Sequence, residues 1–147
     1  MKHFIILFLM IATVSACEQP VCCDTGPPRF FTVIRTSEGM DYLTFNAGEP
    51  IDLYYEGEDD DDQKTDAQPY TFYMGDTTKL EGINVTSLSA EGIKTFYLKV
   101  GSDIDTLFVD VERKGSKWEY KAVRFNGEPA QEIKSPKADP YWLIQKK

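Results

Sequence analysis

Short runs of alternating apolar and polar residues dominate this 147-residue chain from residue 29 onward. Within residues 106–112, Leu107, Val109 and Val111 fall on one face, while Asp110 and Glu112 fall on the other. This period of two is typical of a strand with one buried face. The same alternation, or a dense run of aromatic and β-branched residues, predicts further strands at residues 30–34, 51–55, 70–74, 95–100, 118–125, 130–133 and 141–144.

Turn signals separate these predicted strands. Asn126-Gly127 is typical of a two-residue hairpin, because both residue types accept positive φ. Residues 94–133 are therefore expected to form an antiparallel meander of four strands, with residues 141–144 as a last edge strand. Residues 83–86 are interpreted as one more short strand, and no segment has the length, period and caps of a long helix. About seven to nine short strands predict an all-β fold, an antiparallel β-sandwich.

One predicted strand does not keep a single alternation. Trp118 and Tyr120 share one face with Ala122, whereas Val123 and Phe125 point to the other face. Burying both faces would bury the charged residues between them, which is costly. We therefore expect a β-bulge near Ala122 that flips the register.

The first sixteen residues follow a different pattern. Lys2 precedes an apolar run over residues 4–14, and two small residues stand immediately before Cys17. This arrangement is typical of a secretory signal peptide, and the apolar run is too short to span a bilayer as a stable helix. The small-small-Cys ending resembles the lipobox of bacterial lipoproteins. That resemblance implies cleavage before Cys17 and its acylation.

The expected organisation of the chain follows from this N-terminal segment. Residues 1–16 are a lipoprotein signal peptide, and residues 17–28, with three prolines, are a flexible lipid-anchored tether. Residues 29–147 have the length of one β-sandwich domain. The expected location is the cell envelope, at the periplasmic face or the surface of the outer membrane, with the membrane contacted through the lipid.

Charge and composition narrow the function classes. The chain has 16 basic and 24 acidic residues, a net charge of −8. Such a polyanion is a poor nucleic-acid binder. The single histidine, His3, lies in the signal segment, so the mature chain lacks the imidazole of Ser-His-Asp and Cys-His catalysis and the commonest zinc ligand. We expect no cofactor and no enzymatic activity.

Two adjacent cysteines, Cys22 and Cys23, remain in the tether, in a setting that favours disulfides. Neighbouring cysteines bridge each other only through a strained ring. A vicinal disulfide, pairing with another chain, and two thiols without a role are all compatible with the sequence.

Several short motifs together resemble a family of small lipoproteins common in Bacteroidota. They are the lipobox, the Cys22-Cys23-Asp24 start, the opening of a strand at residues 105–109, and the turn at residues 125–127. The resemblance implies an extracytoplasmic β domain of immunoglobulin-like or transthyretin-like topology. It implies no established activity, so no functional residue follows from it.

Two acidic motifs are candidates for chemistry. Calcium prefers six to eight oxygen ligands, and the acidic run supplies carboxylates at Glu58, Asp59, Asp60, Asp61 and Asp62. Because the acids are consecutive, without the alternate spacing of an EF-hand, a solvated loop is favoured over a calcium site. Asp103 and Asp105 match the paired carboxylates of a glycosidase, but a turn in which they cap backbone amides is the simpler interpretation.

The tyrosines offer a candidate partner face. Tyr54, Tyr73 and Tyr97 each oppose the apolar side of their predicted strand, so we expect them to share an outer face. Exposed rings can receive a protein or a glycan, although half-buried tyrosines also strengthen cross-strand pairs. The predicted function is a non-enzymatic, lipid-anchored domain that binds a protein or glycan through one sheet face. The alternatives are a calcium-stabilised accessory domain and an acid-dependent hydrolase.

Overall fold

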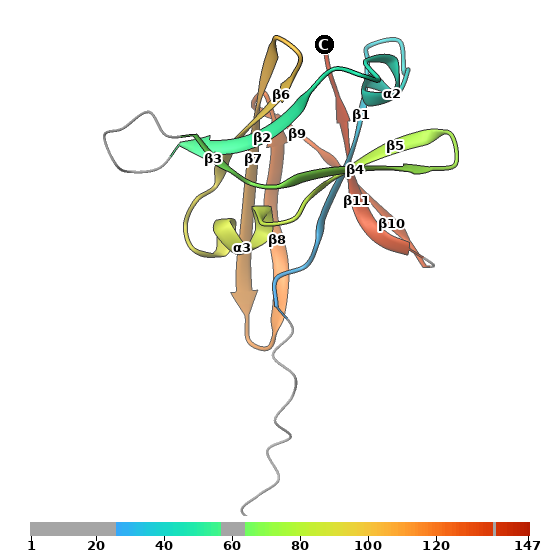
Figure 1. Cartoon of the computed structure of the whole chain (residues 1–147). Helices are drawn as coiled ribbons and strands as arrows, with labels where there is room; N and C mark the ends of the chain where they lie inside the picture. The colour runs from blue at the N-terminus through green and yellow to red at the C-terminus, as the bar shows by residue number, and fades with distance from the viewer. Residues whose placement is uncertain (1–25, 57–63, 137) are drawn as a thin grey trace, which may run out of the picture.

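The protein is an all-β sandwich of two sheets. The computed structural model describes residues 26–56, 64–136 and 138–147. One sheet has five strands in the order β10-β11-β1-β5-β4, and the other has six in the order β3-β2-β6-β7-β8-β9 (Figure 1). The predicted fold class is confirmed, with eleven strands in the described residues instead of seven to nine. Their bounds are β1 Phe30–Arg35, β2 Ile51–Glu56, β3 Lys64–Asp66, β4 Pro69–Met74, β5 Thr77–Gly82, β6 Thr95–Val100, β7 Asp103–Lys114, β8 Lys117–Phe125, β9 Glu128–Pro129, β10 Gln131–Ser135 and β11 Ala138–Gln145.

The core lies between the two sheets and follows the predicted alternation. In β7, Leu107, Val109 and Val111 are buried, while Asp110 and Glu112 lie half-buried on the opposite face. Removal of such apolar side chains from water is the main favourable contribution to folding. The largest fully buried apolar side chains are Phe30, Phe96, Ile34, Leu53, Leu80, Leu98, Leu107 and Ile144.

The predicted bulge lies in β8. Asp110 is in register with Ala122, but the next residue of β7, Val111, is in register with Tyr120. Lys121 is therefore the extra residue of the bulge. This arrangement keeps Val123 and Tyr120 on the core side and leaves Lys121 exposed beside the Glu112 carboxylate, as expected from the cost of burying charge.

The expected four-stranded meander is wrong in its last strand. Asn126 (φ 48°) and Gly127 (φ 83°) form the predicted tight turn after β8, but the strand after it, β9, is only two residues long. The chain then crosses to the other sheet, where β10 pairs with β11. Continued pairing along β8 would meet the bulge at Lys121, where the ladder register is broken.

The last strand is not an edge strand, contrary to expectation. β11 lies between β10 and β1 and runs parallel to β1, with Thr32 in register with Trp142. Ile144 is consequently part of the core. Alternation within one strand defines its two faces but not its neighbours, so the sequence pattern could not place β11 in the sheet interior.

The described residues contain two short helices, α2 (Tyr42–Phe45) and α3 (Val85–Ala90). The expected strand at residues 83–86 is wrong, because α3 begins there. The ladder between β6 and β7 begins at the pair Thr95–Phe108, so β6 does not cover the part of β7 that follows Phe108. The helix α3 packs against that uncovered part of β7. The hydroxyl of Ser89 donates to Val109 O (2.8 Å) and accepts from Val111 N (3.0 Å), so the helix satisfies backbone groups that a strand would otherwise pair.

Candidate functional site

Tyr54 and Tyr97 form a stacked pair on the outer face of the six-stranded sheet. They are in register on the antiparallel strands β2 and β6, and their ring centroids lie 5.4 Å apart with an interplanar angle of 24°. Both side chains alternate with core residues, Leu53 on β2 and Leu98 on β6. Tyr54 is only 7% exposed. The stack is therefore a fixed part of the sheet surface.

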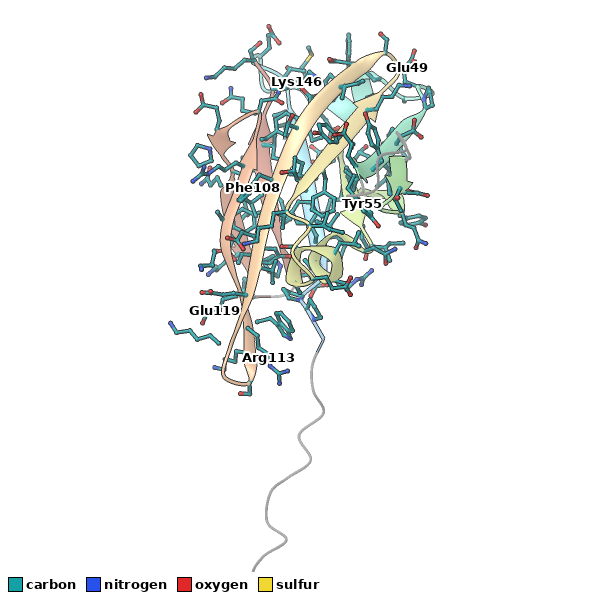
Figure 2. All side chains as sticks on the ribbon, turned by 90° about the vertical axis from the view of Figure 1, so that its left-hand side faces the viewer. Glu49, Tyr55, Phe108, Arg113, Glu119 and Lys146 are labelled. Carbon is teal, nitrogen blue, oxygen red and sulfur yellow. The ribbon has the colours of Figure 1, made fainter. Side chains whose placement is uncertain are left out.

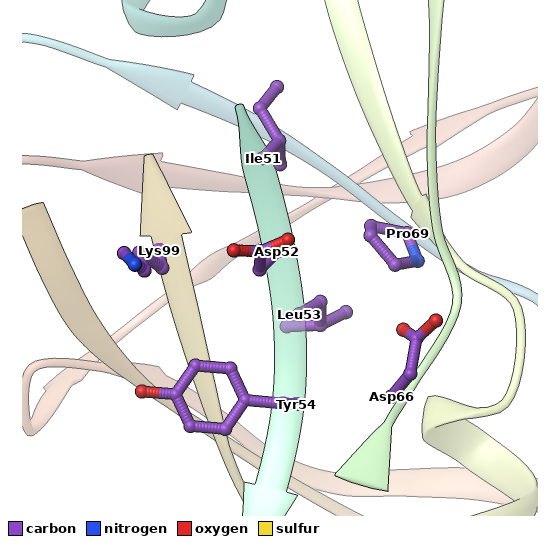
Figure 3. A pocket seen from close by; sticks show the side chains of 7 residues that line it. All are labelled: Ile51, Asp52, Leu53, Tyr54, Asp66, Pro69 and Lys99. Carbon is purple, nitrogen blue, oxygen red and sulfur yellow. The ribbon is translucent and has the colours of Figure 1, made fainter. Parts of the chain in front are cut away.

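A pocket of about 480 Å³ adjoins this stack. It lies at the β2 side of the sandwich, where β3 ends and the chain turns into β4 of the other sheet. Figure 3 shows Asp66 and Pro69 across β2 from Tyr54 and Lys99. Its volume is within the range of small-molecule sites in proteins. The lining residues are Ile51, Asp52, Leu53, Tyr54, Asp66, Pro69 and Lys99.

The pocket has charged groups of both signs. Asp52 and Lys99 are in register on β2 and β6, and neither forms an ion pair with any residue that the structure describes. Asp66 Oδ1 accepts a hydrogen bond from Gln68 N (2.6 Å). Burial, followed by the negative charge of Glu56, raises the pKa of Tyr97, and the Tyr97 hydroxyl donates to Glu56 Oε2 (3.5 Å).

Tyr73 does not join this face. It lies on β4, in the five-stranded sheet, in register with Thr78 of β5, and is 70% exposed. The expectation of a shared outer face holds only for Tyr54 and Tyr97. Tyr73 has the alternation of the other two tyrosines, but its strand belongs to a different sheet.

Asp103 and Asp105 are brought together around a lysine. The Lys146 ammonium contacts a carboxylate oxygen of each residue, and Tyr42 Oη donates to Asp103 Oδ2 (3.1 Å). The hydrogen bond from Lys146 lowers the pKa of Asp103. A general acid in a hydrolase needs a raised carboxyl pKa, whereas the lowered pKa of Asp103 favours its ionised form.

The remaining predicted sites fall outside the described residues. They are Cys17 with its neighbours Cys22 and Cys23, and the acidic run at Glu58, Asp59, Asp60, Asp61 and Asp62. Within residues 26–56, 64–136 and 138–147, no group of three or more His, Cys, Asp or Glu side chains is arranged to hold a metal ion. No helix in those ranges is long and apolar enough to cross a bilayer.

Sequence reasoning did not find Asp52, Asp66, Pro69 and Lys99 as pocket residues. Alternation does place Asp52 beside Tyr54, and Lys99 beside Tyr97, on the polar faces of their strands. However, β2 and β6 are separated by about forty residues, and their pairing brings Asp52 opposite Lys99 only in the folded sheet.

Comparisons of this chain with protein-family models, with curated proteins and with solved structures found no match.

Proposed function

We propose that this chain is a lipid-anchored, non-enzymatic domain of the cell envelope that binds a protein or glycan partner through the outer face of its six-stranded sheet. The observation that carries the proposal is the stacked pair Tyr54–Tyr97 beside a pocket of about 480 Å³. Aromatic rings provide a large contact area at low entropic cost. Asp52 and Lys99 form no ion pair with another described residue, so their charges are available to orient a partner.

The fixed geometry of the stack supports this proposal. Tyr54 is held by its contact with Tyr97 and by the ladder between β2 and β6. A partner that packs against Tyr97 would therefore not have to order a mobile ring. Preorganisation of this kind raises affinity, because less conformational freedom is lost on binding.

The proposed anchor rests on residues 1–17. A signal segment that ends in two small residues and Cys17 supports acylation of that cysteine. The domain begins at Phe30 in the middle of a sheet, so residues 17–28 are the available link to a lipid. We expect Cys17→Ser to release the chain from membranes or to accumulate the precursor. Normal processing with retention in the detergent phase would contradict the anchor without affecting the binding face.

The binding face is tested with a matched pair of variants. Tyr97→Ala removes the outer ring of the stack. Phe45→Ala removes an exposed ring on α2, a helix that packs against β1 and β5 of the five-stranded sheet. Glycan binding is measured by applying each protein to an array of neutral and acidic oligosaccharides. Protein partners are sought by placing a photo-crosslinking residue at position 99 and irradiating intact envelopes. Any protein captured in this way is purified and its affinity for the wild type and both variants is measured.

We expect Tyr97→Ala to weaken binding at least tenfold, the loss typical of a central aromatic contact. Phe45→Ala should bind as the wild type does. Circular dichroism confirms that both variants fold. Equal affinity for the wild type and Tyr97→Ala, with either ligand class, would contradict the proposed face.

A further inference from the structure

Among the described residues, each of the two sheets has an outermost strand on either side, which gives four edge strands. Three of these four are protected against pairing with a strand of another chain. In the described part of the chain, β9 is two residues long and contains Pro129, and β3 is three residues long with Lys64 and Asp66. The edge strand β10 carries Glu132 and Lys134. Short length, proline and charge are the usual features that prevent a sheet edge from pairing with another chain.

The fourth edge, β4, lacks this protection along most of its length. Its six residues, Pro69–Met74, carry no charge, and the proline is at the first position only. Tyr70 and Tyr73 are 58% and 70% exposed. The hairpin of β4 and β5 projects away from the six-stranded sheet (Figure 1), so its outer edge is accessible to another chain.

The register of this hairpin shows which backbone groups point outward. Ile83 N donates to Gln68 O (3.2 Å) just beyond the ladder, so alternate residues from Gln68 onward, Tyr70 and Phe72, direct their N–H and C=O groups to β5. Thr71 and Tyr73 direct theirs to the open side. Neither has a hydrogen-bond partner there within the described residues.

We propose that β4 is a dimerisation edge, which pairs antiparallel with β4 of a second copy of this chain. With the twofold axis at Phe72, Thr71 of one copy lies opposite Tyr73 of the other. This register satisfies every outward N–H and C=O group of both residues in both copies. An antiparallel pair of identical strands is self-complementary, as a twofold interface requires.

Charge also fits a second copy at this edge. Each chain has a net charge of −8, so most surfaces of two copies repel each other. The uncharged β4 edge brings the copies together without placing like charges in direct contact. The stacked pair Tyr54–Tyr97 lies on the other sheet, so this dimer leaves both rings free. Pro69, at the start of β4, also lines the pocket, but it lies outside the pair Thr71–Tyr73 on which the dimer depends, so the two proposals are tested separately.

The test is sedimentation equilibrium of the full chain in mild detergent, between about 1 µM and 1 mM. We expect a reversible monomer–dimer equilibrium that strengthens with added salt, because salt screens repulsion between the acidic chains. Thr71→Pro removes an outward N–H without removing a bond to β5, and Tyr73→Lys places a charge on the edge. Each should raise the dimer Kd at least tenfold.

Two matched controls define the outcome. Thr71→Val keeps the outward N–H, and Phe45→Lys adds the same charge at an exposed position on α2, so both should dimerise as the wild type does. Thermal melting establishes that Thr71→Pro folds, and Tyr73→Lys provides the test if it does not. A wild type that stays monomeric to about 1 mM, or a dimer unchanged by both edge variants, overturns the proposal.

Discussion

The Lys146 ammonium contacts the carboxylate of Asp105 in a largely buried ion pair, with side-chain exposures of 15% and 7%. Asp103 accepts from the same ammonium, and Asn126 Nδ2 donates to the other oxygen of Asp105 (2.7 Å). The ring of Tyr42 lies 4.6 Å from the ammonium. Lys146 therefore ties the C-terminal end of β11 to the start of β7 and to α2, at the end of the molecule opposite Arg113 (Figure 2).

We predict that Lys146→Met destabilises the domain by about 2–4 kcal/mol, because it leaves the buried Asp105 carboxylate without its cation. Urea unfolding measures the change. Lys134→Met is the control, since Lys134 is exposed and pairs with Glu132 on the surface. That variant should change stability by no more than about 0.5 kcal/mol. A loss for Lys146→Met as small as the one expected for Lys134→Met would show that the Lys146 cluster is not stabilising.

The stability contributed by this cluster should depend on pH in a defined way. Hydrogen bonding to Lys146 lowers the pKa of Asp103, so its contribution is present above its unfolded pKa of about 3.9 and is lost as pH falls through the folded value. Burial would lower the pKa of Lys146, but its carboxylate partners outweigh burial and raise the pKa to about 12. Its contribution is present below about pH 10.4 and is lost on approach to 12. The difference in unfolding free energy between wild type and Lys146→Met should therefore narrow only below about pH 3.9 and above about pH 10.4.

Ser89→Ala should cost about 1–3 kcal/mol, because it leaves Val111 N–H and Val109 C=O unsatisfied in the interior. Ser89 is 2% exposed. Ser87→Ala, on the exposed side of the same helix, should be neutral or slightly stabilising, since alanine favours helix. Chemical denaturation compares the two. If the two serines behave alike, the hydroxyl of Ser89 is not what joins α3 to β7.

Gly127→Val should destabilise by about 1–3 kcal/mol through backbone strain. Gly127 has φ 83°, and nothing lies within 4 Å of an added Cβ, so the cost arises from the backbone conformation and not from a collision. Gly127→Asn should lose much less, because asparagine enters this region more readily. Thermal melting distinguishes them, and similar melting midpoints for Val and Asn would refute the strain argument.

Calcium should shift the melting midpoint of the domain little, since the run at residues 58–62 lacks the spacing of an EF-hand. A specific site at a hundred times its Kd would add about 2.7 kcal/mol, which corresponds to several degrees for a domain of this size. A shift that large at low-millimolar calcium, removed when Asp59, Asp60, Asp61 and Asp62 are changed to asparagine, would establish a calcium site.

The sequence pattern predicts those strands whose buried faces are apolar. The alternation of Leu107, Val109 and Val111 defined the inner face of β7, and the change of face at Ala122 revealed the bulge. The strand β5 was missed because its outward residues Lys79 and Glu81 are charged yet buried. Lys79 packs over the Tyr141 ring (4.2 Å) and Glu81 pairs with Arg29. These contacts form only when β1 pairs with β5 and β11 pairs with the other edge of β1.

The candidate site was predictable only within each strand. Alternation correctly placed Tyr54 and Tyr97 on the outward faces of their strands. The same alternation gave Tyr73 an outward face too, but it did not reveal that the strand of Tyr73 belongs to the other sheet. Strand partners depend on long-range packing between segments distant in sequence, which period and propensity do not encode. For the same reason the pocket, which requires β2, β3, β4 and β6 together, has no signature in the sequence.

The position of β1 has a mechanical consequence. This strand is flanked by antiparallel β5 and parallel β11, and Tyr120 Oη also donates to Arg29 O at its entry (3.0 Å). Tension that enters through residue 29 and acts along β1 loads both ladders in shear, so their hydrogen bonds share the force instead of opening one after another. Pulling on the proposed tether would therefore meet the resistance of two ladders in shear.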